Sequence, residues 1–151
     1  MANKIVLKGT GLTRGVAEGE ALVTKQPVNM LATYMQGFML NKPSSVIGDA
    51  RHELFGKDIK GKILIFPYAS GSLACGACLL EAIKQGVAPK ALVGIEMETA
   101  IVEGAIFSDV FLNLPLPIVQ GLDKNPLEII RTGDQVKVDA NTGVVEVTRK
   151  R

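Results

Sequence analysis

The sequence predicts a mixed α/β fold within a single domain that spans residues 1–151. Three observations favour it: many apolar runs have the length of strands, two or three stretches have helical spacing, and the C-terminal part reads as a hairpin. The chain has 151 residues, of which 47% are hydrophobic. That is long enough and apolar enough to bury one proper core.

The N-terminal part is expected to form strands followed by a long loop. Residues 4–8 predict a first strand, which the glycine-rich stretch 9–15 ends, and residues 17–24 predict a second strand with a bulge at 18–20. Residues 27–48 show no regular period and are rich in Met, Asn, Ser and Gly. We therefore expect a surface loop there, able to close over a ligand or a partner.

The centre of the chain reads as strand, loop and helix. The apolar run 63–66 stops at Pro67, and a loop of small residues follows over 69–72. Helical spacing then extends over 78–85, and Gly86 is placed as the C-terminal cap. This pattern predicts a buried strand that leads into a helix, with the chemistry in the loop between them.

A stretch just before this strand matches a nucleotide-binding motif in spacing alone. Residues 56–62 have the P-loop spacing G-x-x-x-x-G-K, but the next residue is Ile63 and not Ser or Thr. A P-loop also needs a strand before it and a helix after it, whereas here a strand follows. We interpret the stretch as a polar turn that precedes a buried strand.

The C-terminal half adds shorter elements. They are a buried strand at 91–95, a short helix at 98–104, apolar segments at 106–111 and 116–119, a turn at 132–134, and a hairpin formed by 135–139 and 144–148. Pro115 and Pro117 limit the stretch between the two apolar segments to a sheet edge or a turn. The hairpin turns at Asn141-Thr142-Gly143.

Charge and hydropathy argue against two classes of partner. The net charge is +2, and the 17 basic residues are spread along the chain apart from a short tail at 149–151. Only two Tyr and five Phe are available to stack on bases, so we expect no nucleic-acid binding. No segment approaches the roughly 20 apolar residues that span a bilayer, and the N-terminal apolar run is too short for a signal peptide. We expect a soluble, cytoplasmic protein with no membrane partner.

Two cysteines, Cys75 and Cys78, form a C-x-x-C pair at the start of the predicted helix. The helix dipole can lower a thiol pKa in this position, which keeps a redox or metal role open. A structural zinc or iron–sulfur site needs about four ligands, and the only histidine is His52. We therefore assign no metal ligands. Two interpretations of the pair remain, namely small apolar residues that pack against a sheet and a disulfide or redox pair.

The loop of small residues carries the candidate chemistry. Ser70, Gly71 and Ser72 let a ligand approach the backbone, and the N–H groups in the first turn of the following helix can hold an anion. A hydroxyl in that position can bind a substrate or attack it. Ser72 also has a simpler alternative role, as the cap of the helix.

Several short segments, taken together in their order and spacing, resemble one family over residues 11–147. They are 15–23, 49–56, 61–64, 71–72 with 80–82, 86–91, 103–106 and 132–139. The family is that of the small subunit, or swivel domain, of aconitase X, which includes dehydratases of phosphomevalonate and of cis-3-hydroxyproline. Residues 29–39 depart from its usual pattern, because an apolar surface replaces the polar contacts that this segment commonly offers.

The resemblance implies a swivelling β/β/α fold of the aconitase-swivel type, capping a separate large subunit that carries an iron–sulfur cluster. In aconitase-type dehydration, a serine alkoxide removes a proton next to a carboxylate while the cluster iron takes the departing hydroxyl. Ser72 matches that serine, directly after Gly71. The implied function is a hydro-lyase subunit with Ser72 as base, acting on a small hydroxy acid: phosphomevalonate, cis-3-hydroxyproline or a related carboxylate.

Substrate binding is expected from the same loop and from three more distant side chains. The full set of candidates is Ser70, Gly71, Leu73, Ala74, His52, Arg51 and Arg14. His52 is expected to bond the substrate or to brace the loop, and Arg51 to pair with a carboxylate or phosphate. The alternative function is a non-catalytic swivel domain that uses this loop to hold an anionic ligand or a partner.

Overall fold

The computed structural model describes residues 3–150, so Met1, Ala2 and Arg151 lie outside it. Its strands are β1 (Lys4–Lys8), β2 (Thr10–Gly11), β3 (Val16–Val23), β4 (Lys62–Phe66), β5 (Ala91–Gly94), β6 (Ile118–Gln120), β7 (Gln135–Asp139) and β8 (Val144–Thr148). Its helices are α1 (Met30–Met39), α2 (Ala74–Lys84), α3 (Thr99–Leu112) and α4 (Pro126–Ile129). The mixed α/β prediction is confirmed; the single domain over residues 1–151 stays a prediction.

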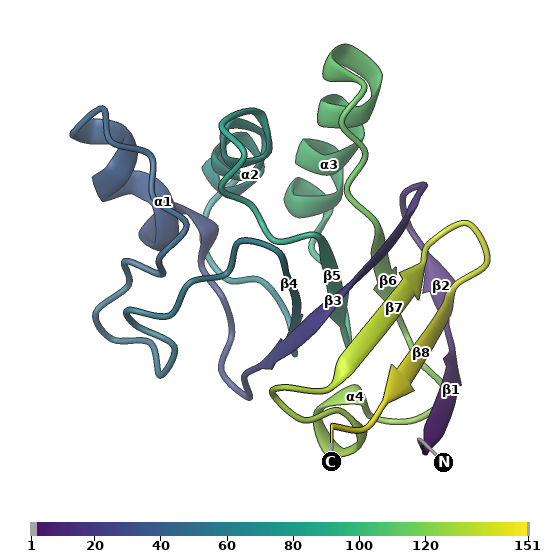
Figure 1. The fold of residues 1–151 in the computed structure, drawn as a ribbon. Coiled ribbons are helices and arrows are strands. Elements are labelled where there is room, and N and C mark those ends of the chain that lie inside the picture. Colours follow the sequence, from purple (N-terminus) through teal and green to yellow (C-terminus); the bar gives the residue numbers. More distant parts are fainter. Residues whose placement is uncertain (1–2, 151) are drawn as a thin grey trace.

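The strands of the described residues form one sheet in the order β1-β8-β7-β3-β4-β5-β6-β2. The pairs from β3 to β6 are parallel, and the others are antiparallel. The chain runs directly from β1 through Gly9 into β2, although these strands stand at opposite ends of the order. The sheet is therefore curled until its two ends meet (Figure 1).

Alternate residues of the strands fill two separate cores, as the period of two in a strand requires. The inner core lies within the curled sheet and is mostly small and branched: Leu7, Ala21, Ile63, Ile65, Ala91, Val93, Val119, Val136, Val138, Val145 and Val147, with Ile130 beyond α4. The outer core lies between the sheet and the helices and includes Leu22, Leu64, Phe66, Leu92 and Ile118. Because β4 and β5 are covered on both faces, they read as unbroken apolar runs.

The helices are divided between the two faces of the parallel strands. α1, α2 and α3 lie side by side over one face, and α4 lies at the opposite side (Figure 1). Each parallel strand ends at the same edge of the sheet, so the loops that lead into α2 and α3 also meet there. No helix within residues 3–150 is long and apolar enough to cross a bilayer.

α2 and α3 approach each other closely because glycines face each other where they cross. A Cβ at Gly76 would collide with the carbonyl oxygen of Ala100, and a Cβ at Gly104 would collide with the carbonyl oxygen of Gly76. Small residues at a crossing let two helix backbones come together, which leaves the larger side chains on either side to form walls. This crossing fixes the position of α2, and with it the loop that carries Ser72.

Residues 27–48 do not form the surface loop that the sequence predicts. Over Met30–Met39 they form α1, whose N-terminus is capped by Asn29: the side-chain oxygen accepts the N–H of Ala32 at 3.0 Å. Met30 and Tyr34 are fully buried in the outer core. Its exposed face also carries Met35 and Met39, so apolar side chains lie on both sides of the helix.

Other boundaries also differ from the predictions. α3 unites the predicted short helix and the apolar segment after it, and it ends at Asn113, which adopts a left-handed conformation. A helix that is apolar on most sides gives no periodic signal.

α2 begins at Ala74 and not at Cys78. The pairing of Val16–Glu20 with β7 is regular, so the predicted bulge is wrong. β2 and α4 are short elements that no sequence pattern indicated.

Candidate active site

The loop between β4 and α2 is held against the start of α1 by backbone hydrogen bonds. The N–H of Ser70 donates to the carbonyl of Val28 at 2.9 Å, and the N–H of Val28 donates to the carbonyl of Tyr68 at 3.2 Å. The N–H groups of Ile95 and Glu96, in the loop before α3, both donate to the carbonyl of Pro67 at 3.1 Å. The segments that lead into α1, α2 and α3 therefore converge on this loop.

Gly71 is the tightest point of the loop. Its φ of +112° is a conformation that residues with a side chain rarely adopt. A Cβ there would lie 2.8 Å from Nδ2 of Asn29 and 2.9 Å from Sγ of Cys75. Cys75 Sγ is itself 3.5 Å from Oδ1 of Asn29 and 3.6 Å from the carbonyl oxygen of Ser70. Asn29 and Cys75 thus enclose the turn and fix the position of Ser72, which follows it.

Ser72 is exposed and stands immediately before α2. Its Oγ accepts the N–H of Ala74 at 3.2 Å, and its carbonyl accepts the N–H of Cys75 at 3.0 Å. An N–H that points at a hydroxyl oxygen, together with the positive end of a helix dipole, favours the ionised form of that hydroxyl. The formal N-cap is Leu73, which makes no side-chain capping bond, so the cap-like contact of Ser72 is to the second residue after it.

The first-turn N–H groups of α2 are less available for an external anion than the sequence suggests. Ala74 donates to Ser72 Oγ, Cys75 donates to the carbonyl of Ser72, and Gly76 donates to the carbonyl of Leu73 at 3.2 Å. The turn therefore uses these donors internally, and one of them, the N–H of Ala74, points at the Ser72 hydroxyl. Of the predicted binding residues, Ser70, Gly71, Leu73 and Ala74 are brought together with Ser72 in this loop, and Leu73 is 82% exposed.

His52 is buried and belongs to a compact turn. Its Nδ1 accepts the N–H of Leu54 at 3.0 Å, while its Nε2 is buried without a hydrogen-bond partner among the described residues. The turn is tied to the end of β3 by Glu53, which accepts the hydroxyl of Thr24 and the N–H of Lys25. The hydrogen bond from Thr24 lowers the pKa of Glu53. This geometry favours a bracing role for His52 over a contact with substrate.

The two predicted arginines are not brought to the loop. The Arg51 side chain is 93% exposed, and its Nε is 3.9 Å from the carboxylate of Asp49. Arg14 pairs with both carboxylate oxygens of Asp109, at 2.7 and 2.6 Å, and this hydrogen-bonded pair raises the pKa of Arg14. Asp109 lies near the C-terminus of α3, at the opposite end of that helix from the loop. The candidate site therefore depends on 70–74 and its supports.

The two cysteines, Cys75 and Cys78, are buried and form no disulfide in the structure. Burial, and the nearby thiol of Cys75, raise the pKa of Cys78, which is opposite to the depression that a reactive thiol needs. Cys75 is used in packing against Gly71. The packing interpretation of the pair is therefore favoured over the redox one.

The described residues do not suit an iron–sulfur cluster. Between residues 3 and 150 no group of three or more His, Cys, Asp or Glu side chains is placed to hold a metal ion. Two buried cysteines on one helix supply at most half of the thiolates that such a cluster uses. We therefore assign no cluster ligand to this part of the chain.

Asn29 is the residue of the candidate site that sequence reasoning missed. It caps α1, touches Cys75 and stands beside Gly71. A signal for it exists, since an Asn before a run of good helix formers is typical of an N-cap. A second neglected feature is the hollow of about 300 Å³ next to the loop, lined by Tyr68, Ala69, Glu96, Met97 and Glu98.

Comparison with known proteins defines the class to which this fold and loop belong. The family profile of the aconitase X swivel domain matches residues 6–147. The chain therefore belongs to the aconitase X swivel domain family. The phosphomevalonate dehydratase small subunit of Methanosarcina acetivorans is 33% identical to it over 147 residues, which cover 97% of this chain and 94% of that one.

Other relatives support the same family assignment. The phosphomevalonate dehydratase small subunit of Thermococcus kodakarensis is 36% identical over 141 residues, 93% of this chain and 95% of its own. The crystal structure of Thermococcus kodakaraensis aconitase X in its holo-form superposes with a TM-score of 0.81 at 34% identity, covering 96% of this chain and 99% of that one. The predicted family is confirmed, and the relatives confirm the predicted class of hydro-lyase subunit.

A more distant solved structure shows the shared fold. The 3-isopropylmalate dehydratase of Methanocaldococcus jannaschii superposes with a TM-score of 0.54 at 18% identity, covering 91% of this chain and 84% of that one. Together with the aconitase X structure, this likeness confirms the predicted swivel-type fold.

Proposed function

We propose that this chain is the small subunit of a phosphomevalonate dehydratase and that Ser72 is the base that it contributes. The substrate and the large-subunit partner are taken from the names of relatives that match nearly the whole chain. The role of Ser72 is supported by one observation in particular. The N–H of Ala74 points at Ser72 Oγ at the N-terminus of α2, with the hydroxyl exposed.

The proposed reaction removes water from a hydroxy acid. Ser72, as an alkoxide, takes the proton from the carbon next to the carboxylate; the electrons of that C–H bond form the new double bond, and the hydroxyl leaves from the adjacent carbon. When bound in the partner, an iron–sulfur cluster supplies a Lewis acid for the departing hydroxyl. This chain holds the base in place and covers the substrate.

A serine hydroxyl is a weak acid, so the alkoxide needs strong local stabilisation. Within this chain, the Ala74 N–H and the α2 dipole act directly on Oγ. Burial under a partner subunit would exclude water from the loop and strengthen both effects. The assembled enzyme is therefore the form in which Ser72 is expected to act.

The second candidate function is a non-catalytic swivel domain that holds an anion at the same loop. It is less favoured, because the N–H groups that would hold the anion already donate to Ser72 and Leu73 within the turn. A domain of this kind would bind phosphomevalonate with the partner absent. The dehydratase subunit would turn it over only in the complex.

The experiment is an anaerobic assay of the chain co-expressed with the large subunit of its own organism. We expect the purified complex to dehydrate phosphomevalonate and to leave cis-3-hydroxyproline unchanged, and neither subunit alone to act. Turnover of cis-3-hydroxyproline in place of phosphomevalonate would contradict the substrate. An iron-loaded complex without activity on either compound would favour the binding domain.

A further inference from the structure

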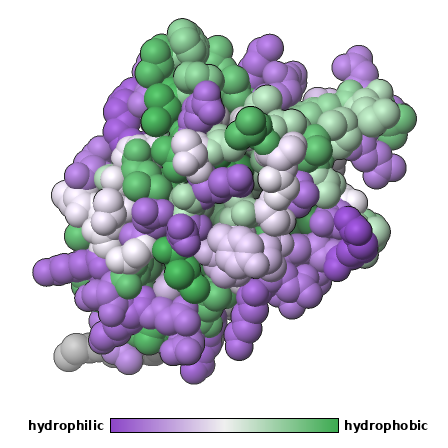
Figure 2. Space-filling model, turned by 180° about the vertical axis from the view of Figure 1, so that it is seen from behind, coloured by the Kyte–Doolittle hydropathy of each residue, from purple (hydrophilic) through white to green (hydrophobic). Residues whose placement is uncertain are grey.

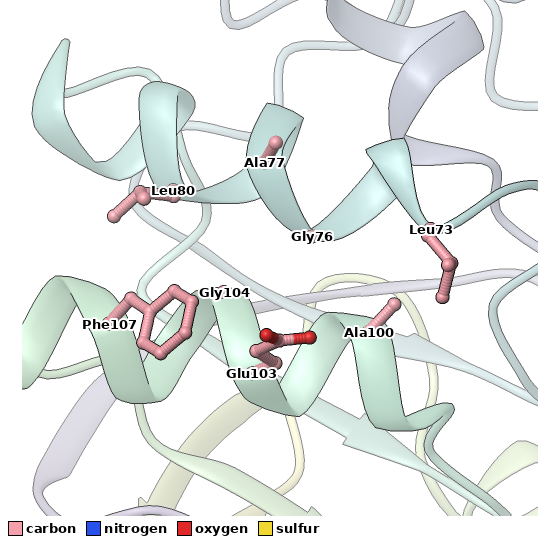
Figure 3. Close-up of a pocket in the computed structure, with 8 residues that line it drawn as sticks. All are labelled: Leu73, Gly76, Ala77, Leu80, Ala100, Glu103, Gly104 and Phe107. Carbon is pink, nitrogen blue, oxygen red and sulfur yellow. The ribbon is translucent and has the colours of Figure 1, made fainter.

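The outer surface between α2 and α3 holds an apolar groove of about 340 Å³. We call it the α2–α3 groove; it is lined by Leu73, Gly76, Ala77, Leu80, Ala100, Glu103, Gly104 and Phe107. Figure 3 shows Leu80 and Phe107 facing each other at one end, Leu73 at the other, and the Glu103 carboxylate between them. The groove exists because Gly76 and Gly104 bring the helix backbones together and leave no side chain to fill the floor.

The apolar surface extends beyond the groove along α3. Val110 and Phe111 are 68% and 73% exposed, and the rings of Phe107 and Phe111 pack against each other with their centres 5.6 Å apart. Figure 2 shows hydrophobic side chains gathered at the top of the molecule, where α3 lies. Single exposed apolar residues need no explanation, but a continuous patch with a hollow in it is typical of an interface.

The groove begins beside the candidate base. Leu73 follows Ser72 directly, is 82% exposed, and forms one end of the groove. A subunit that brings its own catalytic groups to Ser72 must therefore also cover Leu73. From there the lining of the groove continues through Ala77 to Phe107, with Glu103 as the one interruption by a charged side chain.

From this continuity we propose that the α2–α3 groove is the docking surface for the large subunit, which inserts an apolar or aromatic side chain between Leu80 and Phe107. Glu103 is the one charged residue among the lining side chains. Its carboxylate lies on the groove surface (Figure 3), so the inserted segment should also present a Lys, an Arg or free N–H groups to it. The inference depends on the proposed function, since it takes the large subunit as the partner.

The test measures the Kd between the two subunits by sedimentation velocity. The subunits are purified together and then separated before the measurement. Ala77→Arg places a long charged side chain in the groove at an exposed helical position. Val6→Arg is the control, because Val6 is 46% exposed and belongs to β1, which lies at the opposite end of the molecule from α2 and α3 (Figure 1). Losing a central interface contact costs about 2 kcal/mol or more, so Ala77→Arg should raise Kd at least about 30-fold. Val6→Arg should leave Kd within about threefold.

Hydroxyl-radical footprinting of the wild-type complex gives a second measure that needs no variant. Leu73, Phe107 and Phe111 should lose reactivity when the large subunit binds, while Val6 should not. The surface assignment is overturned if the wild type binds with these side chains still reactive, or if Ala77→Arg binds as tightly as the wild type.

Two further outcomes separate this inference from the proposed function. If the wild-type chain and the large subunit do not associate at all, the subunit assignment fails, and the docking surface fails with it. If the wild-type chain alone forms a dimer that Ala77→Arg dissolves, the groove binds a second copy and the inference is wrong, although the dehydratase can still be assayed.

Discussion

The thiol of Cys75 donates to Oδ1 of Asn29 across 3.5 Å, and the two side chains enclose Gly71 between them. Asn29 belongs to the cap of α1, and Cys75 belongs to the first turn of α2. The contact therefore joins the N-termini of two helices around the turn that precedes Ser72. The position of the proposed base depends on this pair.

Replacing Gly71 by Ala should disturb the site more than it disturbs the fold. The variant combines a φ of +112° with close contacts to Asn29 and Cys75, and we expect it to lower the free energy of unfolding by about 1–3 kcal/mol. Its kcat should fall at least tenfold, because Ser72 is displaced. Thermal melts and steady-state kinetics of the assembled enzyme measure the two effects.

Gly56→Ala is the control for this variant. Gly56 also has a positive φ, of +79°, but a Cβ at this position would meet no other atom within 4 Å. The substitution should lower the free energy of unfolding by about 1–2 kcal/mol, because a residue with a Cβ is strained at a positive φ, and it should leave kcat unchanged. An equal loss of activity in both variants would show that strain, and not the position of Ser72, controls turnover.

Asn29→Ala tests the link between the α1 cap and the loop. Losing an N-cap side chain costs about 1 kcal/mol of stability. Asn125 offers a matched control, since it caps α4 through a 3.0 Å bond to the N–H of Leu127, and α4 lies on the other side of the sheet (Figure 1). Both variants should lose similar stability by urea denaturation, but only Asn29→Ala should lower kcat. If Asn125→Ala lowers kcat as much, the contact with Cys75 has no positioning role.

The pH dependence of thiol alkylation separates packing from redox chemistry at Cys78. The ordinary pKa of a cysteine is about 8.5, and burial raises that of Cys78. Less thiolate is therefore present at any given pH than in a free thiol, so alkylation of Cys78 by iodoacetamide should stay slow through about pH 8 and rise only above about pH 9. The rate of Cys78 alkylation is measured by mass spectrometry in a Cys75→Ser variant. Fast alkylation at neutral pH would restore the redox interpretation.

Much of the fold follows from sequence patterns because its strands obey simple rules. β4 and β5 are unbroken apolar runs between turn residues, and β7 and β8 alternate around a glycine turn. The helices are harder to predict from the sequence. α3 is apolar on most sides, so it lacks the period that marks an amphipathic helix, and α1 carries apolar side chains on its exposed face as well as on its buried one. An interface on these surfaces would explain that composition.

The candidate site was predictable only in part. The small residues around Ser72 pointed to the loop, because their order after a buried strand is local information. Asn29 and Cys75 meet across 46 positions of sequence, and no local pattern shows such a contact. The pairing of Arg14 with Asp109, which lies 95 positions away at the far end of α3, is likewise invisible to local patterns.

The most direct test of the proposed role of Ser72 is the turnover of phosphomevalonate by the assembled enzyme with Ser72→Ala. Ser44→Ala is the matched control, because Ser44 Oγ accepts the N–H of Val46 at 3.1 Å in the same local arrangement but far from the loop in sequence. With Ser72 as the base, we expect kcat to fall by about 10²–10⁴ with subunit assembly intact, and the control to keep full activity. A Ser72→Ala enzyme that retains kcat within a few-fold of the wild type would contradict the central claim.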